Sequence, residues 1–507
     1  MAERDQRTEL LNTLLTTPHR NLAALHPVHA SLVALDPRFY VHLAAWYADH
    51  GTIRDHKELF VSMLSVSDFE GHRDVGLALL RRLPPYELAR VVDFIKGRQV
   101  VVERHAARPG QTPRRGRTGE VEIRKEREGL FRNIPRAMKT EITRYLRERE
   151  ANDNTFDRAA MTARRAMKHL YAGLHIQPSK RAQAILFDES PPEDSLAFAI
   201  KEISHAASPQ EQARAISAHK VPYRVASSLI REMSPMVLAA LIDVMTPQEL
   251  INSMGSLKRR GALDNKDIKS LVDAKLKKAG GDARVSAYKA KVAVEAADLD
   301  GELAQSLEAV TEQKVRAAAR ITRPTALLID KSGSMEEAME TGKQLGALIS
   351  AVTDAELISY AFDTAAYAVE ARGTSLAEWE KALRGLSAQG GTSCGVAIER
   401  MRKKKQRVEQ IVMVTDEDEN TAPLFADAYQ AYADAMKVRP AVILVKIGRA
   451  RNLLEVACAG LGVAPNVLEF RGDYYALPNI IPLLTYPSLA EMIMEILDYP
   501  LPKRKAS

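Results

Sequence analysis

The chain has 507 residues, of which 46% are hydrophobic and 27% charged, as in soluble globular proteins with two or more domains. No run approaches the roughly 18 apolar residues that a membrane span needs. The first residues, MAERDQRTEL, lack the apolar segment of a secretory signal. Two cysteines, Cys394 and Cys458, are too few for a disulfide framework or a four-thiolate zinc site. We therefore expect a cytoplasmic protein with no membrane partner.

Charge is distributed unevenly along the chain. From residue 321 onward there are 21 Lys and Arg residues against 24 Asp and Glu residues, whereas the preceding part has 51 against 41. All 12 histidines lie before residue 220. The front part is basic enough to hold a polyanion, and the back part has no imidazole to serve as a base or a zinc ligand.

Before residue 320, apolar residues recur at spacings of three and four, which is the period of amphipathic helices. Helix starts are marked by SPQE at 208–211, SPMV at 234–237 and TPQE at 246–249, and the first and third also place a Glu for a capping box. Short helices in succession predict an all-α, HEAT-like helical-repeat domain over residues 1–320. An irregular helical bundle is the alternative, because no strict repeat period is visible.

After residue 320, strand and helix patterns alternate. Apolar runs predict strands at 325–330, 355–362, 410–416, 441–448 and 466–470, and SLAE at 375–378 and again at 488–491 predicts two helix starts. Such an alternation predicts a doubly wound α/β domain over residues 321–507, with a parallel sheet covered on both faces. Domains of this kind bind ligands beyond the C-terminal ends of their strands.

Five oxygen-bearing side chains are predicted to meet at that edge of the sheet. The first strand ends in DKSGSM, a glycine-flanked loop reads GGTSC, and a later strand ends in VTDED; the five residues are Asp330, Ser332, Ser334, Thr392 and Asp416. Carboxylate and hydroxyl oxygens suit Mg²⁺ and would also accept Mn²⁺ or Ca²⁺. Serines that merely cap the following helix would explain one of these positions, not five.

This pattern resembles the metal-ion-dependent adhesion site of von Willebrand factor type A domains, Asp-x-Ser-x-Ser followed by a loop Thr and a strand-end Asp. The resemblance implies that Ser332, Ser334 and Thr392 contact the metal most directly. Catalytic interpretations fit less well. GTSCG at 391–395 has the letters of a nucleophile elbow but no buried strand before it, and no phosphate-binding loop occurs anywhere. We expect no enzyme activity.

Two segments of the basic part could contact nucleic acid. The stretch from Arg104 to Asn133 is rich in arginine and is interpreted as a loop or insertion that runs into a charged helix. The segment at 158–187 predicts a basic helix leading into HIQPSKR, whose cations would neutralise phosphates while Tyr171 or His175 stacks on a base. A solvated helix face is an equally weighted alternative. The candidate RNA-binding residues are Arg158, Arg164, Arg165, Lys168, His169, His175, Lys180 and Arg181.

A helical-repeat part followed by this metal-site domain resembles the TROVE family, named for telomerase, Ro and vault proteins. Besides DKSGSM, GGTSC and VTDED, the segments HIQPSKRAQAILF and MSPMVLAALIDVMTPQEL are similar to the family's helical segments. The resemblance implies a ring of repeats in a Ro-like, non-catalytic RNA-binding protein. Such a protein binds small noncoding (Y-like) RNA and single-stranded ends of structured or misfolded RNA for quality control. It admits an exoribonuclease or another RNA-processing partner, and we expect a monomer.

A different class of function remains open. Von Willebrand A domains also dock on AAA+ ATPases, where an acidic residue of the partner completes the metal shell. In that case the helical part would be a protein-docking domain. The sequence does not identify the RNA or the ligand that completes the metal shell.

Overall fold

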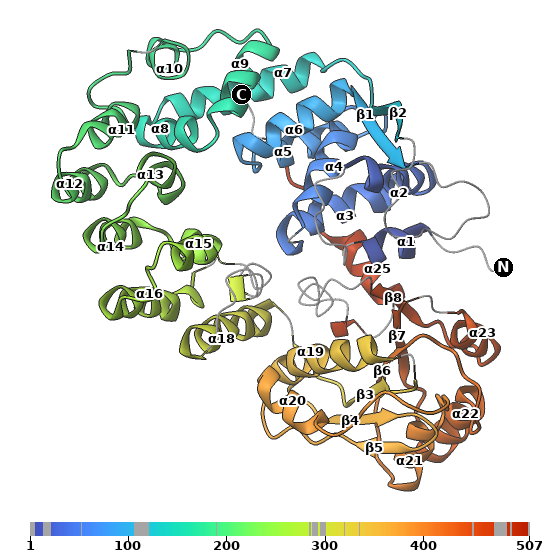
Figure 1. Cartoon of the computed structure of the whole chain (residues 1–507). Helices are drawn as coiled ribbons and strands as arrows, with labels where there is room; N and C mark the ends of the chain where they lie inside the picture. Colours follow the sequence, from blue (N-terminus) through green and yellow to red (C-terminus); the bar gives the residue numbers. More distant parts are fainter. Residues whose placement is uncertain are drawn as a thin grey trace. The chain divides into compact units, whose positions relative to one another are not determined.

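The computed structural model describes residues 6–13, 22–51, 53–105, 121–188, 190–282, 285, 290, 293–294, 301–318, 320–333, 335–448, 451–470, 484–486 and 489–504 (Figure 1). The chain divides into two compact units. The smaller unit comprises Pro18–Asp49, Arg54–Lys201 and Tyr499–Ser507, and the larger unit comprises Met1–Thr17, His50–Ile53 and Glu202–Asp498. The units part at residue 201 rather than at the change of sequence pattern near residue 320, because later helices pack against one another and α18 packs against α19. The predicted domain boundary at 320/321 stays a prediction.

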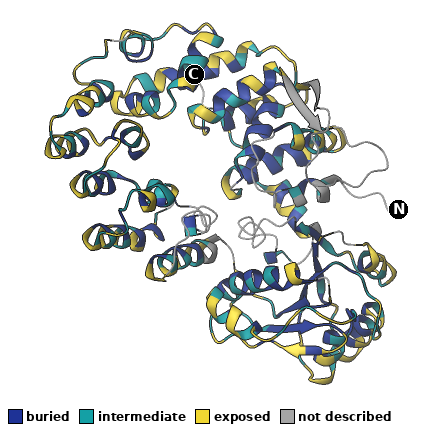
Figure 2. Cartoon of the chain, viewed as in Figure 1, coloured by how far each residue is buried: buried dark blue, intermediate teal, exposed yellow. Residues whose placement is uncertain are grey.

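The smaller unit is built from short amphipathic helices, as the apolar spacing predicts. These helices are α2 (Leu22–Leu35), α3 (Pro37–His50), α4 (Arg54–Ser65), α5 (His72–Leu80), α6 (Pro85–Lys96), α7 (Arg136–Glu150), α8 (Asp153–Thr162), α9 (Arg164–Gly173), α10 (Lys180–Leu186) and α11 (Leu196–His205), whose end continues into the larger unit. Their apolar faces form the core, seen as the buried stripes in Figure 2. The C-terminal tail belongs to this unit: Arg504 Nε donates to Glu141 Oε2 at 2.9 Å, and Tyr499 donates to Asp49 at 2.8 Å.

The arginine-rich stretch differs from the expectation of a loop running into a charged helix. Strands β1 (Arg98–His105) and β2 (Val121–Glu128) pair antiparallel, from Arg98 opposite Glu128 to His105 opposite Val121. The β-branched residues of QVVV and VEI favour strand over helix, and this local preference outweighs the charge of the following residues. Residues 106–120 lie outside the described part. The front part of the chain is therefore helical with one strand pair, not purely helical.

In the larger unit, helices stack in a regular succession. They are α12 (Pro209–His219), α13 (Tyr223–Leu229), α14 (Pro235–Val244), α15 (Pro247–Arg259), α16 (Lys266–Ala279) and α18 (Gly301–Ala318). The predicted N-caps Ser208, Ser234 and Thr246 all cap their helices. Thr246 and Glu249 form the predicted capping box, whereas the Glu211 carboxylate accepts from the amide of Ala207 instead.

Several contacts between these helices recur at the same sequence separation. Helix α14 packs against α12 and α16, and α16 packs against α18. Tyr223 bonds to Ser256, Arg260 donates to the carbonyl of Ser227, and Lys275 donates to that of Ile242; each pair is separated by 33 residues. Arg260 and Lys275 thus each bond to a carbonyl near the end of a helix, 33 residues earlier in the chain.

The α/β part of the larger unit has the predicted doubly wound sheet. Its strands are β3 (Thr325–Asp330), β4 (Leu357–Phe362), β5 (Ala366–Ala368), β6 (Gln410–Thr415), β7 (Ala441–Ile447) and β8 (Asn466–Phe470), in the order β5-β4-β3-β6-β7-β8. All pairs are parallel except that of β4 with the short β5, which the sequence did not indicate. The helices are α19 (Glu336–Val352), α20 (Leu376–Leu383), α21 (Val396–Lys403), α22 (Phe425–Met436), α23 (Leu453–Gly460) and α25 (Leu489–Asp498), and α1 (Gln6–Thr13) packs against β8.

The strand order reverses between β3 and β6. From β3 the chain continues through α19 to β4 on one side, and from β6 it continues through α22 to β7 on the other. Both strands are buried along their whole length (Figure 2). The C-terminal ends of β3 and β6 therefore frame the crevice in which doubly wound folds hold their ligands.

Candidate functional site

Asp330 lies at the C-terminal end of β3, where it is fully buried. Its Oδ1 accepts from the Ser332 amide at 2.9 Å, and its Oδ2 accepts from the Thr415 hydroxyl at 2.7 Å. Burial raises the pKa of Asp330 above its ordinary value, and the nearby Asp416 carboxylate raises it further, whereas these hydrogen bonds lower it. The site therefore disfavours the negative charge of Asp330, which a divalent cation would relieve.

Asp416 directly follows β6, the strand beside β3, as predicted. The Asp418 amide donates to Asp416 Oδ1 at 3.0 Å, and the Arg451 amide donates to the Asp416 carbonyl at 3.0 Å. Ser332 is also buried and lies in the turn that the Asp330 carboxylate closes. Ser334, the fifth predicted ligand, lies outside the described residues.

Thr392 is buried on the glycine-flanked loop and is held there by Asn420. The Asn420 side chain accepts from the Thr392 amide at 3.0 Å, and the Thr392 carbonyl accepts from the amides of Asn420 and Thr421 at 3.0 and 2.9 Å. Glu419, beside Asn420, accepts from the amides of Cys394 and Phe425 at 3.1 and 2.7 Å. The loop after β6 thus fixes the loop that carries Thr392.

Lys331 ties three loops of the site together through its side chain and its backbone. Its side chain is 2% exposed, and Nζ lies 2.5 Å from Asp363 Oδ2 and 4.9 Å from the Tyr367 ring centroid. Its amide donates to the Phe362 carbonyl, and its carbonyl accepts from the Gln389 amide, both at 2.8 Å. Burial raises the pKa of Asp363, but the hydrogen bond and charge of Lys331 outweigh it and hold the pKa below the ordinary value.

The described donors are hard oxygen ligands. Asp330, Ser332, Thr392 and Asp416 belong to three loops that hydrogen bonds hold together, and they fit a cation such as Mg²⁺ better than zinc. Burial raises the pKa of the neighbouring Cys394 thiol well above its ordinary value, and Glu419 and Asp330 raise it further, so a thiolate ligand is disfavoured. Among the described residues, no cluster of three or more His, Cys, Asp and Glu side chains suits a metal. Any metal held by these four residues would therefore depend on hydroxyl ligands.

Sequence reasoning missed the residues that support these ligands. Thr415, Asn420 and the Lys331–Asp363 pair hold the carboxylate and the loops in place. Thr415 and Lys331 stand beside predicted ligands in the sequence, but only the fold shows which way their side chains point. Asp363 and Asn420 lie on other loops, and the sequence alone gives no signal for them.

The basic helix predicted in the first part of the segment 158–187 is divided into two helices. Helix α8 ends at Thr162 and α9 begins at Arg164, with Ala163 at φ −132° and ψ 35° between them. Arg158, Arg165 and His169, which are spaced by seven and four residues and would share one face of a continuous helix, therefore lie on two separate helices. Ala163 stands at the N-cap of α9 but has no side chain that could cap the helix, so the sequence gives no sign of this break.

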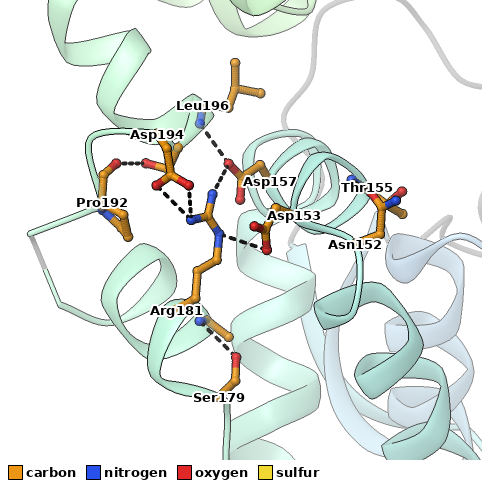
Figure 3. A network of polar contacts seen from close by, with 11 residues as sticks. Asn152, Asp153, Thr155, Asp157, Ser179, Arg181, Pro192, Asp194 and Leu196 are labelled. Carbon is orange, nitrogen blue, oxygen red and sulfur yellow. Dashed lines mark hydrogen bonds and ion pairs between the residues drawn. The ribbon is translucent and has the colours of Figure 1, made fainter.

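Arg181 is enclosed by carboxylates (Figure 3). Its Nη1 lies 2.9 Å from both oxygens of Asp194, its Nη2 lies 3.1 Å from Asp157, and its Nε lies 3.3 Å from Asp153. Asp157 also accepts from the Leu196 amide at 2.8 Å, so the network joins α8, α10 and the start of α11. The guanidinium has a structural role that leaves it poorly placed for a phosphate.

Four further candidates make contacts within the protein. Arg164 Nη2 donates to the Leu186 carbonyl at 2.9 Å, Lys168 Nζ lies 5.5 Å from the Phe187 ring centroid, and His169 Nε2 lies 2.6 Å from Asp93 Oδ1. Tyr171 is buried and donates to Glu150 at 2.7 Å. Contrary to the expectation, its ring is therefore not available to stack on a base.

Four candidates are exposed: Arg158, Arg165, His175 and Lys180. Within the described residues, no hydrogen bond or ion pair occupies the charged groups of Arg165 and Lys180. These two cations, on α9 and α10, are the best placed of the original set to meet a phosphate. The helices that carry them pack against each other.

Across the part of the chain that the structure describes, no helix is both long enough and apolar enough to cross a membrane. Comparison with protein-family models gives no match, and none of the curated proteins matches the chain. Among solved structures, the proximal thread matrix protein 1 of the mussel byssus is 13% identical and matches 33% of this chain and 48% of its own. Its TM-score of 0.27 is too low to indicate a common fold.

A different solved structure is similar over nearly the whole length. The crystal structure of the Ro (RSR) protein of Deinococcus radiodurans matches 90% of this chain and 92% of its own chain, with a TM-score of 0.60 at 15% sequence identity. The match includes both the succession of helices and the α/β part, because neither alone would reach this coverage. The chain therefore has a Ro-like fold, as the sequence resemblance predicted.

Proposed function

We propose that this chain is a non-catalytic, Ro-like RNA-binding protein that holds small noncoding RNA and single-stranded ends of structured or misfolded RNA. The observation that carries this proposal is the similarity to the Ro protein over 90% of this chain and 92% of the other. Charge supports it, since the part before residue 321 has 51 basic against 41 acidic residues. Within that part, Arg165 and Lys180 are exposed cations with no partner among the described residues.

Fluorescence anisotropy with a labelled RNA hairpin that carries a single-stranded tail tests the proposal. The full chain should bind this probe, and Arg165→Ala with Lys180→Ala should weaken binding about tenfold, since each lost phosphate contact removes a charge-assisted bond. The log–log salt slope should become shallower by about 1.4, because each of the two lost contacts with a single strand contributes roughly 0.7. Two exposed cations of the α/β part, Lys381 and Arg384, provide a control variant with the same change of charge.

A full chain that binds no RNA hairpin at any salt concentration would overturn the proposal. Docking on an AAA+ ATPase would then become the better interpretation. If the Arg165 and Lys180 variant and the control variant weaken binding equally, the effect is one of net charge and these two residues are not contacts.

We also propose a divalent metal centre at Asp330, Ser332, Ser334, Thr392 and Asp416, with Mg²⁺ as its natural ion. Asp330 and Asp416 would balance the charge of the ion, and the hydroxyls would supply neutral ligands. The buried Asp330 carboxylate, whose pKa burial and Asp416 raise, supports a cation there. A bound ion would supply a positive centre that attracts an acidic group of a partner.

Calorimetry with Mn²⁺ tests the metal centre. Asp330→Ala should abolish binding by the full chain, whereas Asp434→Ala, which removes an exposed carboxylate of α22, should leave it unchanged. Circular dichroism of both variants checks that the fold is kept. Equal Mn²⁺ affinity in Asp330→Ala and the unchanged chain would show that the centre is misplaced.

A further inference from the structure

Positive charge in the α/β part is concentrated in two short stretches. Residues 399–409 and 434–439 contain eight basic and three acidic residues. The whole chain from residue 321 onward has 21 basic and 24 acidic residues, so the remainder has 13 against 21. A part of the chain that is acidic on balance thus carries one strongly basic region.

The fold brings the two stretches side by side at the edge where β6 and β7 begin. Helix α21 packs against α22, and both end at this edge (Figure 1). The Tyr432 hydroxyl near the end of α22 accepts from the Val408 amide at 2.8 Å and donates to the Gln406 carbonyl at 2.7 Å. The Ala441 amide donates to the Glu409 carbonyl at 2.9 Å, which joins the two connections where the strands start.

Six exposed cations line this edge, which we call the cationic edge: Lys403, Lys404, Lys405, Arg407, Lys437 and Arg439. Three of them have a nearby acceptor. Lys403 Nζ lies 3.4 Å from Glu399, Arg407 Nη1 lies 2.7 Å from Glu409, and Arg439 Nη1 donates to the Leu461 carbonyl at 3.0 Å.

The other three, Lys404, Lys405 and Lys437, have ammonium groups with no hydrogen bond or ion pair among the described residues. Lys405 and Lys437 also adopt positive φ angles of 57° and 53°, a conformation that favours glycine. Cations offset the dipole at a helix C-terminus, but Arg402 and Lys403 already lie in the last turn of α21. Helix capping therefore does not account for Lys404 and Lys405, whereas Lys437 directly follows α22, which has no basic residue in its last turn.

The edge has no aromatic surface among its described residues. Gln406, between the lysines and Arg407, accepts from the Tyr360 hydroxyl at 2.8 Å, and the nearby rings of Tyr429 and Tyr432 are buried. Without exposed rings the edge has no platform on which bases could stack. A cluster of exposed cations instead suits the phosphates of a structured RNA.

We propose that the cationic edge binds the phosphate backbone of structured RNA without reading its bases, through residues other than those of α9 and α10. This inference rests on the proposed RNA-binding function and assigns a second contact to it. The lysines supply point charges, which suit backbone contacts of this kind.

The experiment measures binding of the full chain to a labelled RNA hairpin without a tail, over a range of salt concentrations. Lys404→Ala, Lys405→Ala and Lys437→Ala together should weaken binding at least tenfold. The log–log salt slope should become shallower by about 2 to 3, because each of three phosphate contacts contributes roughly 0.7 to 0.9. The same three positions changed to Arg should restore both quantities, since charge and not lysine itself is required. A control variant changes Arg372, Lys381 and Arg384 to Ala, which removes the same charge around α20.

Each outcome decides the inference. Weakening confined to the cationic-edge variant and reversed by arginine supports it. Equal binding by the cationic-edge and α20 variants overturns it, while binding of tailed RNA that depends on Arg165 and Lys180 would leave the proposed function standing. An unchanged chain that binds neither probe overturns both. Thermal denaturation of each variant shows whether a loss of binding reflects a loss of fold.

Discussion

Replacing Arg181 by Met should destabilise the helices around it. Asp153 and Asp194 are mostly exposed, so each pair contributes less than about 1 kcal/mol. The Asp157 side chain is 5% exposed, and a buried carboxylate that loses its partner costs about 3 to 5 kcal/mol. Because the Leu196 amide still donates to Asp157 and the Arg181 side chain is itself 21% exposed, we expect a loss of about 2 to 3 kcal/mol.

Hydrogen exchange of the full chain, followed by mass spectrometry, measures this loss locally. Amides of α8, α10 and the start of α11 should exchange about 30- to 150-fold faster, at roughly 1.4 kcal/mol for each factor of ten. Adding Asp157→Asn should recover part of the loss, since the amide is neutral and its oxygen keeps the Leu196 bond. Lys180→Met is the matched control, because it removes the neighbouring cation that has no partner among the described residues.

The two variants should therefore have opposite effects. Arg181→Met should change exchange and leave the salt slope of RNA binding unaltered, whereas Lys180→Met should leave exchange unaltered and make that slope shallower. If Arg181→Met exchanges like the unchanged chain and weakens RNA binding, the guanidinium is an RNA contact and the structural interpretation is refuted.

Three further predictions follow from buried charges. Lys331→Met should weaken Mn²⁺ binding about tenfold, because it frees the loops of the proposed centre. Adding Asp363→Asn to this variant should restore part of the lost affinity. If calorimetry shows the same Mn²⁺ affinity for Lys331→Met as for the unchanged chain, Lys331 does not position the centre. Burial raises the pKa of Glu58 to about 8, against 4.5 as its ordinary value. Between these two values the folded chain holds a proton that the unfolded chain loses, so the thermal stability of the smaller unit should fall as pH rises. Glu58→Gln should flatten this pH profile. A thermal stability that rises with pH over this range would contradict the prediction. Arg504→Ala should destabilise α7 by about 1 to 2 kcal/mol, since it leaves the buried Glu141 with fewer partners. Lys503→Ala is the control and should leave α7 unchanged. Hydrogen exchange of the α7 amides measures both effects.

The α/β part could be predicted well because its signals are local. A run such as TALLID at 325–330 is too apolar for an exposed segment and too short for a helix, so it specifies a buried parallel strand. Once Asp330 and Asp416 follow two such strands, the topology alone brings them to one edge. The short β5 was missed because its three residues have no pattern of their own and depend on pairing with β4.

The basic part was harder to predict because charge does not indicate where a side chain points. Arg165 and Arg181 have the same side chain in neighbouring helices, yet one is exposed and the other lies among three carboxylates. Asp153 and Asp157 lie on α8 and Asp194 lies just before α11, so only the packing of α8 against α10 reveals the network. The strand pair β1–β2 was missed for a related reason, since its arginines concealed a β-branched pattern.

The proposed metal centre and the cationic edge lie at opposite ends of the same strands, so binding at one should hardly affect the other. Strand β6 has six residues, and at about 3.3 Å for each residue the two ends are roughly 20 Å apart. Salt screens exposed charges over about 8 Å at physiological ionic strength, so direct electrostatic coupling is small. In one Mg²⁺-containing buffer, Asp330→Ala and the unchanged chain should therefore bind the untailed RNA hairpin with equal affinity and equal salt slope. A difference of tenfold or more would mean that the sheet transmits a conformational change from one edge to the other.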